Sequence, residues 1–206
     1  GKSTLFSLMT KNLEPDSGRV FIRGRNLKNI SLKDFATKVA IVQQYNDAPG
    51  DITVRQLVSF GRTPHITFLG EGEKEDEEKI AWAMEVTGIS EYSEREISRL
   101  SGGQKQRLAM SRALVLKPDI LILDDSLSAV DAKTEHLILK NLKTERDDKT
   151  TIITAHRLSA VVHADLILVM ENGRIKERGT HQELLTQNGW YAQTYHKQQL
   201  AENLKE

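Results

Sequence analysis

Three short apolar runs, each ending in polar residues, constrain this chain more than any other feature. The runs read VAIVQQ, DILILDD and TTIITAH, and they end at Gln44, Asp125 and His156. Runs of this length are typical of strands buried on both faces, and segments with helical spacing of apolar residues separate them. Strands that alternate with helices form a mostly parallel sheet flanked by helices, with functional residues at the carboxyl ends of the strands. We therefore predict an α/β fold in which these three polar ends are candidate site positions.

The segment between the first two runs has a different character. Residues 51–99 are mostly charged and helical in pattern, and EGEKEDEEKIAWAMEV places Ile80 and Met84 four residues apart on one apolar stripe. The chain of 206 residues is long enough for one sizeable domain. We predict a catalytic core from residues 1–50 and 100–206, with a helical subdomain inserted at about 51–99.

The first four residues, GKST, match the end of the phosphate-binding loop GxxxxGK[ST]. In such a loop the backbone N–H groups and the helix N-terminus hold phosphates, the lysine reaches the β- and γ-phosphates, and the hydroxyl residue ligates Mg²⁺. Gly1, Lys2, Ser3 and Thr4 fit these roles. The chain begins inside the motif, so we expect the start of the loop and the first strands of the sheet to be missing. By themselves the four letters could equally open an ordinary capped helix.

Two acids follow the second apolar run. In LILDD, Asp124 and Asp125 stand where a buried strand emerges, from which one carboxylate can hold Mg²⁺ and the other can orient a hydrolytic water. Acids are also common at the ends of ordinary strands. This pair alone therefore leaves a structural role open.

The most specific motif is LSGGQ, at residues 100–104. Ser101, Gly102, Gly103 and Gln104 stand at the start of a helical pattern, where glycines let backbone donors approach an anion closely. Followed by KQR, this motif resembles the signature of the ABC (ATP-binding cassette) ATPase family. The resemblance implies a P-loop NTPase fold and binding of ATP with Mg²⁺.

The other motifs of that family occur in order along the chain, and the resemblance implies a role for each. The catalytic residues would be Gln44 of the Q-loop, Asp125 and the switch histidine His156. The metal would be held by Ser3, Gln44 and Asp124. The remaining nucleotide-binding residues would be Gly1, Lys2, Thr4, Ser101, Gly102, Gly103, Gln104 and Asp131, the last from the D-loop segment SAVD.

The resemblance also implies partners. Two cassettes of this family pair head to tail, so that each nucleotide lies between the Lys2 loop of one and the Ser101 signature of the other, and the pair drives transmembrane domains. The chain has 29 basic and 29 acidic residues, which favours no nucleic-acid partner, and it has no cysteine, which fits a reducing compartment. No run of 18 apolar residues occurs. We expect a cytoplasmic protein, peripheral to the inner face of the membrane through its partners.

Two departures from the family pattern are visible. The position after Asp124 is normally glutamate, and Asp125 resembles the degenerate half of heterodimeric bacterial multidrug exporters. VSFGRTPH and its surroundings resemble cassettes of iron-siderophore and cobalamin importers, whereas the chain from about Leu100 onward resembles multidrug or lipid exporters. A chimera joined near the signature would explain this mixture, and a divergent single lineage is the alternative.

Three functions are compatible with these motifs. The first is an ATP-hydrolysing motor subunit of a transporter. The second is a soluble ABC ATPase of DNA repair or translation, although such proteins usually show paired cassettes or long coiled-coil insertions. The third is an engineered or fragmentary cassette with little ATPase activity. The motifs leave the transported substrate and the direction of transport open.

Overall fold

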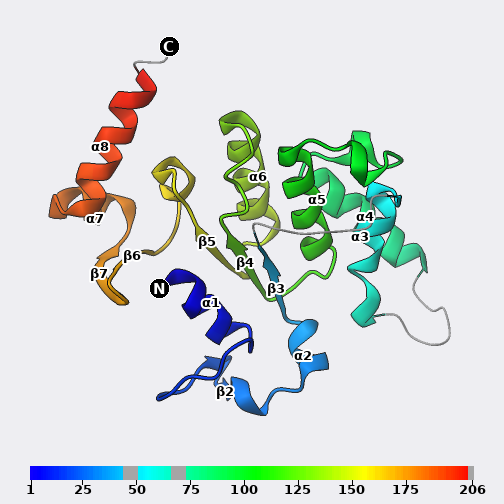
Figure 1. Cartoon of the computed structure of the whole chain (residues 1–206), viewed down its shortest axis with the longest axis horizontal. Coiled ribbons are helices and arrows are strands. Elements are labelled where there is room, and N and C mark those ends of the chain that lie inside the picture. The colour runs from blue at the N-terminus through cyan, green and yellow to red at the C-terminus, as the bar shows by residue number, and fades with distance from the viewer. Residues whose placement is uncertain (44–50, 66–72, 204–206) are drawn as a thin grey trace. The chain divides into compact units, whose positions relative to one another are not determined.

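The computed structural model describes residues 1–43, 51–65 and 73–203 (Figure 1). The described chain divides into two compact units, Glu14–Ile153 and Gly1–Leu13 together with Thr154–Glu206. The α/β fold predicted from the sequence is confirmed. Gln44 lies outside the described residues.

The strands are short and stand between helices. They are β1 (Phe21–Ile22), β2 (Arg25–Asn26), β3 (Val39–Val42), β4 (Ile120–Asp124), β5 (Thr150–Thr154), β6 (Ile167–Glu171) and β7 (Arg174–Gly179).

Eight α-helices are assigned within the described residues, with short 3₁₀ turns between them. The α-helices are α1 (Lys2–Met9), α2 (Leu32–Ala36), α3 (Val54–Phe60), α4 (Glu73–Val86), α5 (Gly102–Leu114), α6 (Ala132–Glu145), α7 (His181–Gln187) and α8 (Trp190–Asn203). The 3₁₀ turns are η1 (Leu27–Asn29), η2 (Thr63–His65), η3 (Ser90–Tyr92), η4 (Ile97–Arg99) and η5 (Leu158–Val161).

A three-stranded sheet in the order β3-β4-β5 carries the predicted apolar runs. β3 and β4 are parallel, in a register that pairs Val39 with Ile120 and Val42 with Leu123. The central residues of β4 are completely buried, as expected for a strand covered on both faces. In β5, the last strand of this sheet, no residue is buried, so the burial predicted for the run TTIIT is wrong. Because β3 and β4 are parallel, Gln43 and Asp124 lie at the same end of the sheet.

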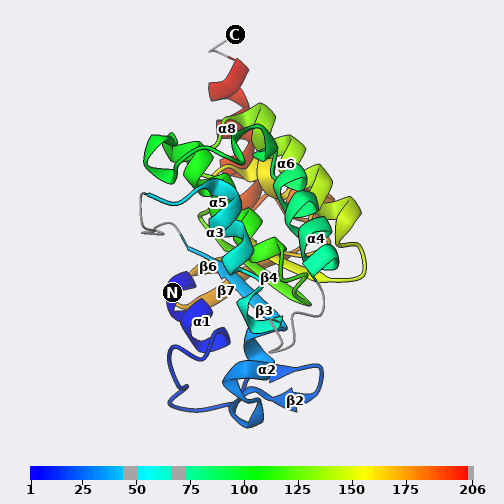
Figure 2. The same cartoon turned by 90° about the vertical axis from the view of Figure 1, so that its right-hand side faces the viewer.

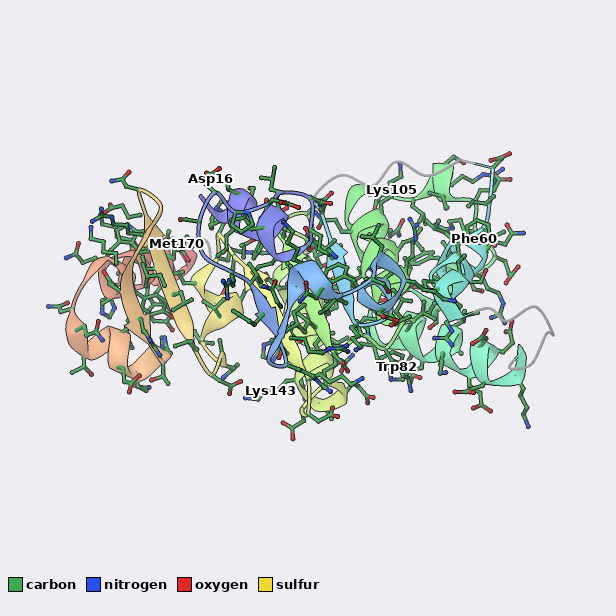
Figure 3. All side chains as sticks on the ribbon, turned by 90° about the horizontal axis from the view of Figure 1, so that it is seen from below. Asp16, Phe60, Trp82, Lys105, Lys143 and Met170 are labelled. Atoms are coloured by element: carbon green, nitrogen blue, oxygen red, sulfur yellow. The ribbon has the colours of Figure 1, made fainter. Side chains whose placement is uncertain are left out.

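Helices α3, α4 and α5 pack on one another within the Glu14–Ile153 unit (Figures 1 and 2). Ile80 and Met84 of α4 belong to the same buried cluster as Leu121 and Leu123 of β4, which confirms the predicted apolar stripe. The indole N–H of Trp82, seen in Figure 3, donates to Glu145 Oε2 at 2.9 Å and ties α4 to α6. The segment 51–99 is thus helical where described, but its separate domain status stays a prediction.

A buried arginine fixes the start of β4 and β5. The guanidinium of Arg146, at the end of α6, donates to the carbonyls of Pro118 at 3.0 Å and Thr150 at 3.2 Å, and to Thr151 Oγ1 at 3.2 Å. Burial lowers the pKa of Arg146. These bonds satisfy a charge that would otherwise be costly to bury, and they hold the N-terminal ends of two strands together.

The unit formed by Gly1–Leu13 and Thr154–Glu206 has a core of its own. β6 and β7 form an antiparallel hairpin with Asn172 and Gly173 at its turn, at φ of 50° and 77°, the left-handed pair that a two-residue hairpin requires. An Asn-Gly pair between two strand patterns is the usual sequence signal for such a turn, and the structure has the turn at these residues. The buried residues of this unit's core are Leu158, Ile167, Val169, Leu184 and Tyr191.

Candidate functional site

The LSGGQ motif forms the start of α5. Ser101 is the N-cap, and its hydroxyl accepts from the backbone N–H of Gln104 at 3.3 Å, while Gln104 Oε1 accepts from the Ser101 N–H at 2.8 Å. This reciprocal pair is a capping box, which satisfies two of the donors that a helix start leaves open. Ser101 and Gly102 are exposed at the positive end of the helix dipole. The remaining N–H groups there suit an anionic ligand.

The two glycines of the motif have different neighbours. A Cβ on Gly103 would lie 2.8 Å from the carbonyl oxygen of Ala129, whereas a Cβ on Gly102 would meet no atom within 4 Å. Gly103 is therefore needed for close backbone packing. Gly102 leaves open space at the helix start.

Gln106 joins the signature helix to the segment 128–131. Its Oε1 accepts from the Ala129 N–H at 3.0 Å and its Nε2 donates to Ser128 Oγ at 3.3 Å. This role of Gln106 is not predictable from the sequence. Gln106 lies only two positions after the motif, but no sequence pattern indicates that it bonds to Ala129, 23 residues further along the chain.

The two acids lie at the end of β4, both half-buried. Asp125 has a left-handed backbone, at φ of 51°, so the chain turns sharply as the strand ends. The next residue, Ser126, is buried and donates to the carbonyl of Val42 at 3.2 Å, which joins the ends of β3 and β4. Asp125 also accepts through its carbonyl from Ser128 Oγ at 3.0 Å.

Asp131 caps α6 in this structure. Its carboxylate accepts from the backbone N–H of Thr134 at 2.9 Å, and the hydrogen bonds from Thr134 hold the pKa of Asp131 below its usual range. A carboxylate has about four lone-pair sites, so accepting these hydrogen bonds leaves it further acceptor capacity. The nucleotide-binding role of Asp131 stays a prediction.

The first residues of the chain form the start of α1. Lys2, Ser3 and Thr4 lie in the first turn and are exposed, and Gly1 is the N-cap. The first turn, KSTL, holds no acidic residue and Gly1 has no capping side chain, so the helix dipole is not neutralised there. This helix start therefore suits phosphate groups in the way the sequence predicts.

His156 follows β5 and is exposed. Its backbone carbonyl accepts a hydrogen bond from Gln198 Nε2 at 2.8 Å. Lys2 and His156 belong to one compact unit, and Ser101, Asp124, Asp125 and Asp131 belong to the other. Within the Glu14–Ile153 unit, the signature, the Asp125 turn and the 128–131 segment are brought together.

The hydroxyl of Ser3 and the carboxylate of Asp124 are oxygen donors of the kind that Mg²⁺ prefers. Across the described ranges 1–43, 51–65 and 73–203, no three histidine, aspartate or glutamate side chains cluster as a metal site of their own. Each of these two donors, taken by itself, is of the kind that holds magnesium together with substrate phosphates and water.

Residues 1–128 match the family model described as ABC transporter. The chain belongs to the ABC transporter family. This family assignment confirms the resemblance seen in LSGGQ and the ordered motifs.

Relatives and a solved structure agree with this assignment. A probable multidrug resistance ABC transporter ATP-binding/permease protein of Bacillus subtilis is 43% identical over 97% of this chain and 34% of its own length. A putative multidrug export ATP-binding/permease protein of Staphylococcus aureus is 38% identical over 97% of the chain and 35% of its own length. A bacterial Atm1-family ABC exporter solved with ATP bound superposes with a TM-score of 0.83 and 31% identity, over 96% of this chain and 35% of that one.

The chain thus spans about a third of the length of the relatives it matches. Each alignment runs across both halves of the chain, so the comparisons give no support to a junction near Leu100, and the chimera stays a prediction. Among the helices of the described residues, none combines the length and apolar character needed to span a bilayer.

Proposed function

We propose that this chain is the ATP-binding and ATP-hydrolysing motor cassette of an ABC exporter. The observation that carries the proposal is the start of α5, where a capped, glycine-rich helix N-terminus is held against the 128–131 segment by Gly103 and Gln106. This arrangement presents backbone donors and a hydroxyl to an anion from a rigid support.

The proposed roles follow the chemistry of each side chain. Lys2 binds the β- and γ-phosphates of ATP, and the N–H groups at the start of α1 bind phosphate oxygens. Asp125 orients the attacking water, and His156 contacts the γ-phosphate. Gln44, which lies outside the described residues, would help to hold the metal and the water.

Ser3 and Asp124 would hold Mg²⁺, which neutralises the charge that develops on the transferred phosphoryl group. Phosphoryl transfer needs little covalent chemistry from the protein, so positioning and charge stabilisation supply most of the catalysis.

The proposed partners are a second cassette and transmembrane domains. Ser101, Gly102, Gly103 and Gln104 of this cassette would face a nucleotide held by the phosphate loop of the partner cassette. ATP binding would draw the two together and hydrolysis would release them, and this motion would drive export. The cassette would then work at the cytoplasmic face of the membrane. Support comes from the exporter relatives, whose printed names join ATP-binding and permease functions.

The hydrolytic site is proposed to be weak. Aspartate is one methylene shorter than glutamate, so the Asp125 carboxylate is drawn back by about 1.5 Å, one C–C bond. A misplacement of about 1 Å can cost about a hundredfold in rate. A partner cassette would then supply the faster site.

The proposal is tested by ATP hydrolysis with the protein at its natural length. Lys2→Ala is expected to reduce hydrolysis and ATP affinity by at least about tenfold, because it removes a charge that binds the phosphates. Lys33→Ala, which removes an exposed lysine from α2, is the matched control and should leave both unchanged. Equal behaviour of the two variants would contradict the proposal.

A further inference from the structure

The side chain of Gln198, on α8, is hydrogen-bonded to the backbone on both sides of Arg157. Its Oε1 accepts from the Leu158 N–H at 2.8 Å and its Nε2 donates to the carbonyl of His156 at 2.8 Å. The two partners are separated from Gln198 by about forty residues in sequence but belong to the same compact unit. A primary amide offers one acceptor and two donors, so it can pair with a backbone segment as another peptide group would.

These hydrogen bonds replace ones that the local structure leaves open. Leu158 is the first residue of η5, and the N–H groups at a helix start have no partner within the helix. Arg157, at the N-cap position, provides no side-chain cap. Gln198 thus caps η5 from a different helix.

Helix α8 is well placed to act as a support. Glu177 of β7 accepts from the N–H groups of Trp190 at 2.5 Å and Tyr191 at 3.1 Å, which fixes the helix start. Tyr191 is completely buried, and its hydroxyl is hydrogen-bonded to His181 Nδ1 at 2.9 Å.

The spacing along α8 brings Gln198 to the anchored face. Tyr191, Tyr195 and Gln198 follow one another at intervals of four and three residues, so they share one side of the helix. Helix α8 also packs against η5. The position of Gln198 is therefore fixed by the same core that buries Leu158.

We propose that Gln198 is a positioning residue that holds the backbone of His156 for its contact with the γ-phosphate. Gln198 fixes the His156 carbonyl and the Leu158 N–H, and with them the direction in which the exposed imidazole leaves the chain. The inference rests on the proposed role of His156. It adds that the C-terminal helix of the cassette sets the precision of the hydrolytic site.

The test compares kcat and KM for MgATP hydrolysis by the protein at its natural length, with its partner cassette present and carrying no competent site of its own. Gln198→Ala removes both hydrogen bonds, and we expect kcat to fall between about tenfold and a hundredfold, as for a misplacement of about 1 Å. KM should stay within about twofold, because Gln198 does not touch the nucleotide. Gln198→Glu keeps the acceptor for Leu158 but loses the donor to His156, so an intermediate kcat is expected. Gln193→Ala, an exposed glutamine on the same helix, is the matched control and should change neither constant.

A double variant separates positioning from general stability. In a His156→Ala background, Gln198→Ala should lower kcat no further, because the side chain it positions is gone. A kcat of the double variant tenfold below that of His156→Ala would overturn the inference. A kcat of Gln198→Ala equal to that of wild type, with His156→Ala impaired, would also overturn it.

Amide hydrogen exchange at Leu158 distinguishes failure of this inference from failure of the proposed function. Exchange should be faster in Gln198→Ala than in wild type and in Gln193→Ala, whatever His156 does in catalysis. Unchanged exchange would overturn the inference. If exchange is faster but His156→Ala hydrolyses ATP normally, the proposed role of His156 is wrong and the positioning role falls with it.

Discussion

At the scale of single residues, the proposed water-orienting residue Asp125 follows β4 and has an unusual backbone conformation. Asp125 adopts a left-handed conformation at φ of 51°, which aspartate tolerates better than most residues because its short side chain can bond locally. The same short side chain shortens the reach of the carboxylate. Local conformation and catalytic reach therefore favour different residues at this position.

We predict that Asp125→Glu raises ATP hydrolysis by at least about tenfold. The added methylene moves the carboxylate forward by about 1.5 Å, toward the place where a general base would orient water. The measurement is steady-state phosphate release from the protein at its natural length, with its partner cassette present and carrying no competent site of its own.

Asp147→Glu is the matched control, since it makes the same change at an exposed position after α6 and should leave the rate unchanged. Thermal unfolding of both variants shows whether the left-handed backbone disfavours glutamate. A rate in Asp125→Glu equal to wild type would show that Asp125 does not limit hydrolysis.

Asp131 gives a prediction for pH. The hydrogen bonds from Thr134 lower the folded-state pKa of Asp131, so the ionised carboxylate stabilises the fold above the unfolded pKa of about 3.8. That stabilisation is lost as pH falls through the lower folded-state pKa. Asp131→Asn keeps an oxygen for the Thr134 N–H but does not titrate.

The free energy of unfolding of wild type minus that of Asp131→Asn should therefore be constant between about pH 6 and 8 and shrink below about pH 4. Urea unfolding at a series of pH values measures it. A difference that persists undiminished to about pH 3 would show that the carboxylate is not stabilised in the folded state.

At the scale of elements, the start of α5 and the 128–131 segment behave as one structural group. Gly103 lets the two backbones approach, and Gln106 bonds to Ser128 and Ala129. The two segments are therefore in direct contact. This contact joins the signature to the loop that follows Asp125.

The paired glycines allow a controlled test of that contact. Gly103→Ala should lower the free energy of unfolding by about 1–3 kcal/mol, because its Cβ would lie 2.8 Å from the Ala129 carbonyl and backbone atoms must shift. Gly102→Ala meets no atom within 4 Å and should be neutral or stabilising by up to about 1 kcal/mol. Urea unfolding of both variants measures the difference, and equal stabilities would mean that the close packing is absent in solution.

At the scale of the whole molecule, fold and family agree. A parallel β3-β4 pair covered by helices, a helical segment between those strands, and a C-terminal hairpin with two helices match the fold of an ATP-bound exporter at a TM-score of 0.83. The importer-like pattern noted around VSFGRTPH does not prevent multidrug transporter relatives from aligning along 97% of the chain. Transport itself is proposed for a larger assembly, because this chain spans about a third of those relatives.

The sequence by itself determined the α/β class, the buried strands β3 and β4, the Asn172-Gly173 turn and the family, whereas the burial predicted for TTIIT is wrong. These features depend on residue periodicity, on turn residues and on short contiguous motifs, all of which are local. The helix start at Lys2 and the capped helix start at Ser101 were predictable for the same reason. Their catalytic and binding roles stay predictions.

Only the tertiary structure decided how the motifs are supported. Gln106 is hydrogen-bonded to Ala129, 23 residues away, and Gln198 is hydrogen-bonded to the carbonyl of His156. Gly103 differs from Gly102 because a Cβ added to it would lie against the Ala129 carbonyl. Each of these contacts joins residues distant in sequence, and a glutamine or a glycine carries no local pattern that names its partner. The physical reason is that hydrogen bonds and close packing depend on three-dimensional proximity, which the folding of the whole chain creates.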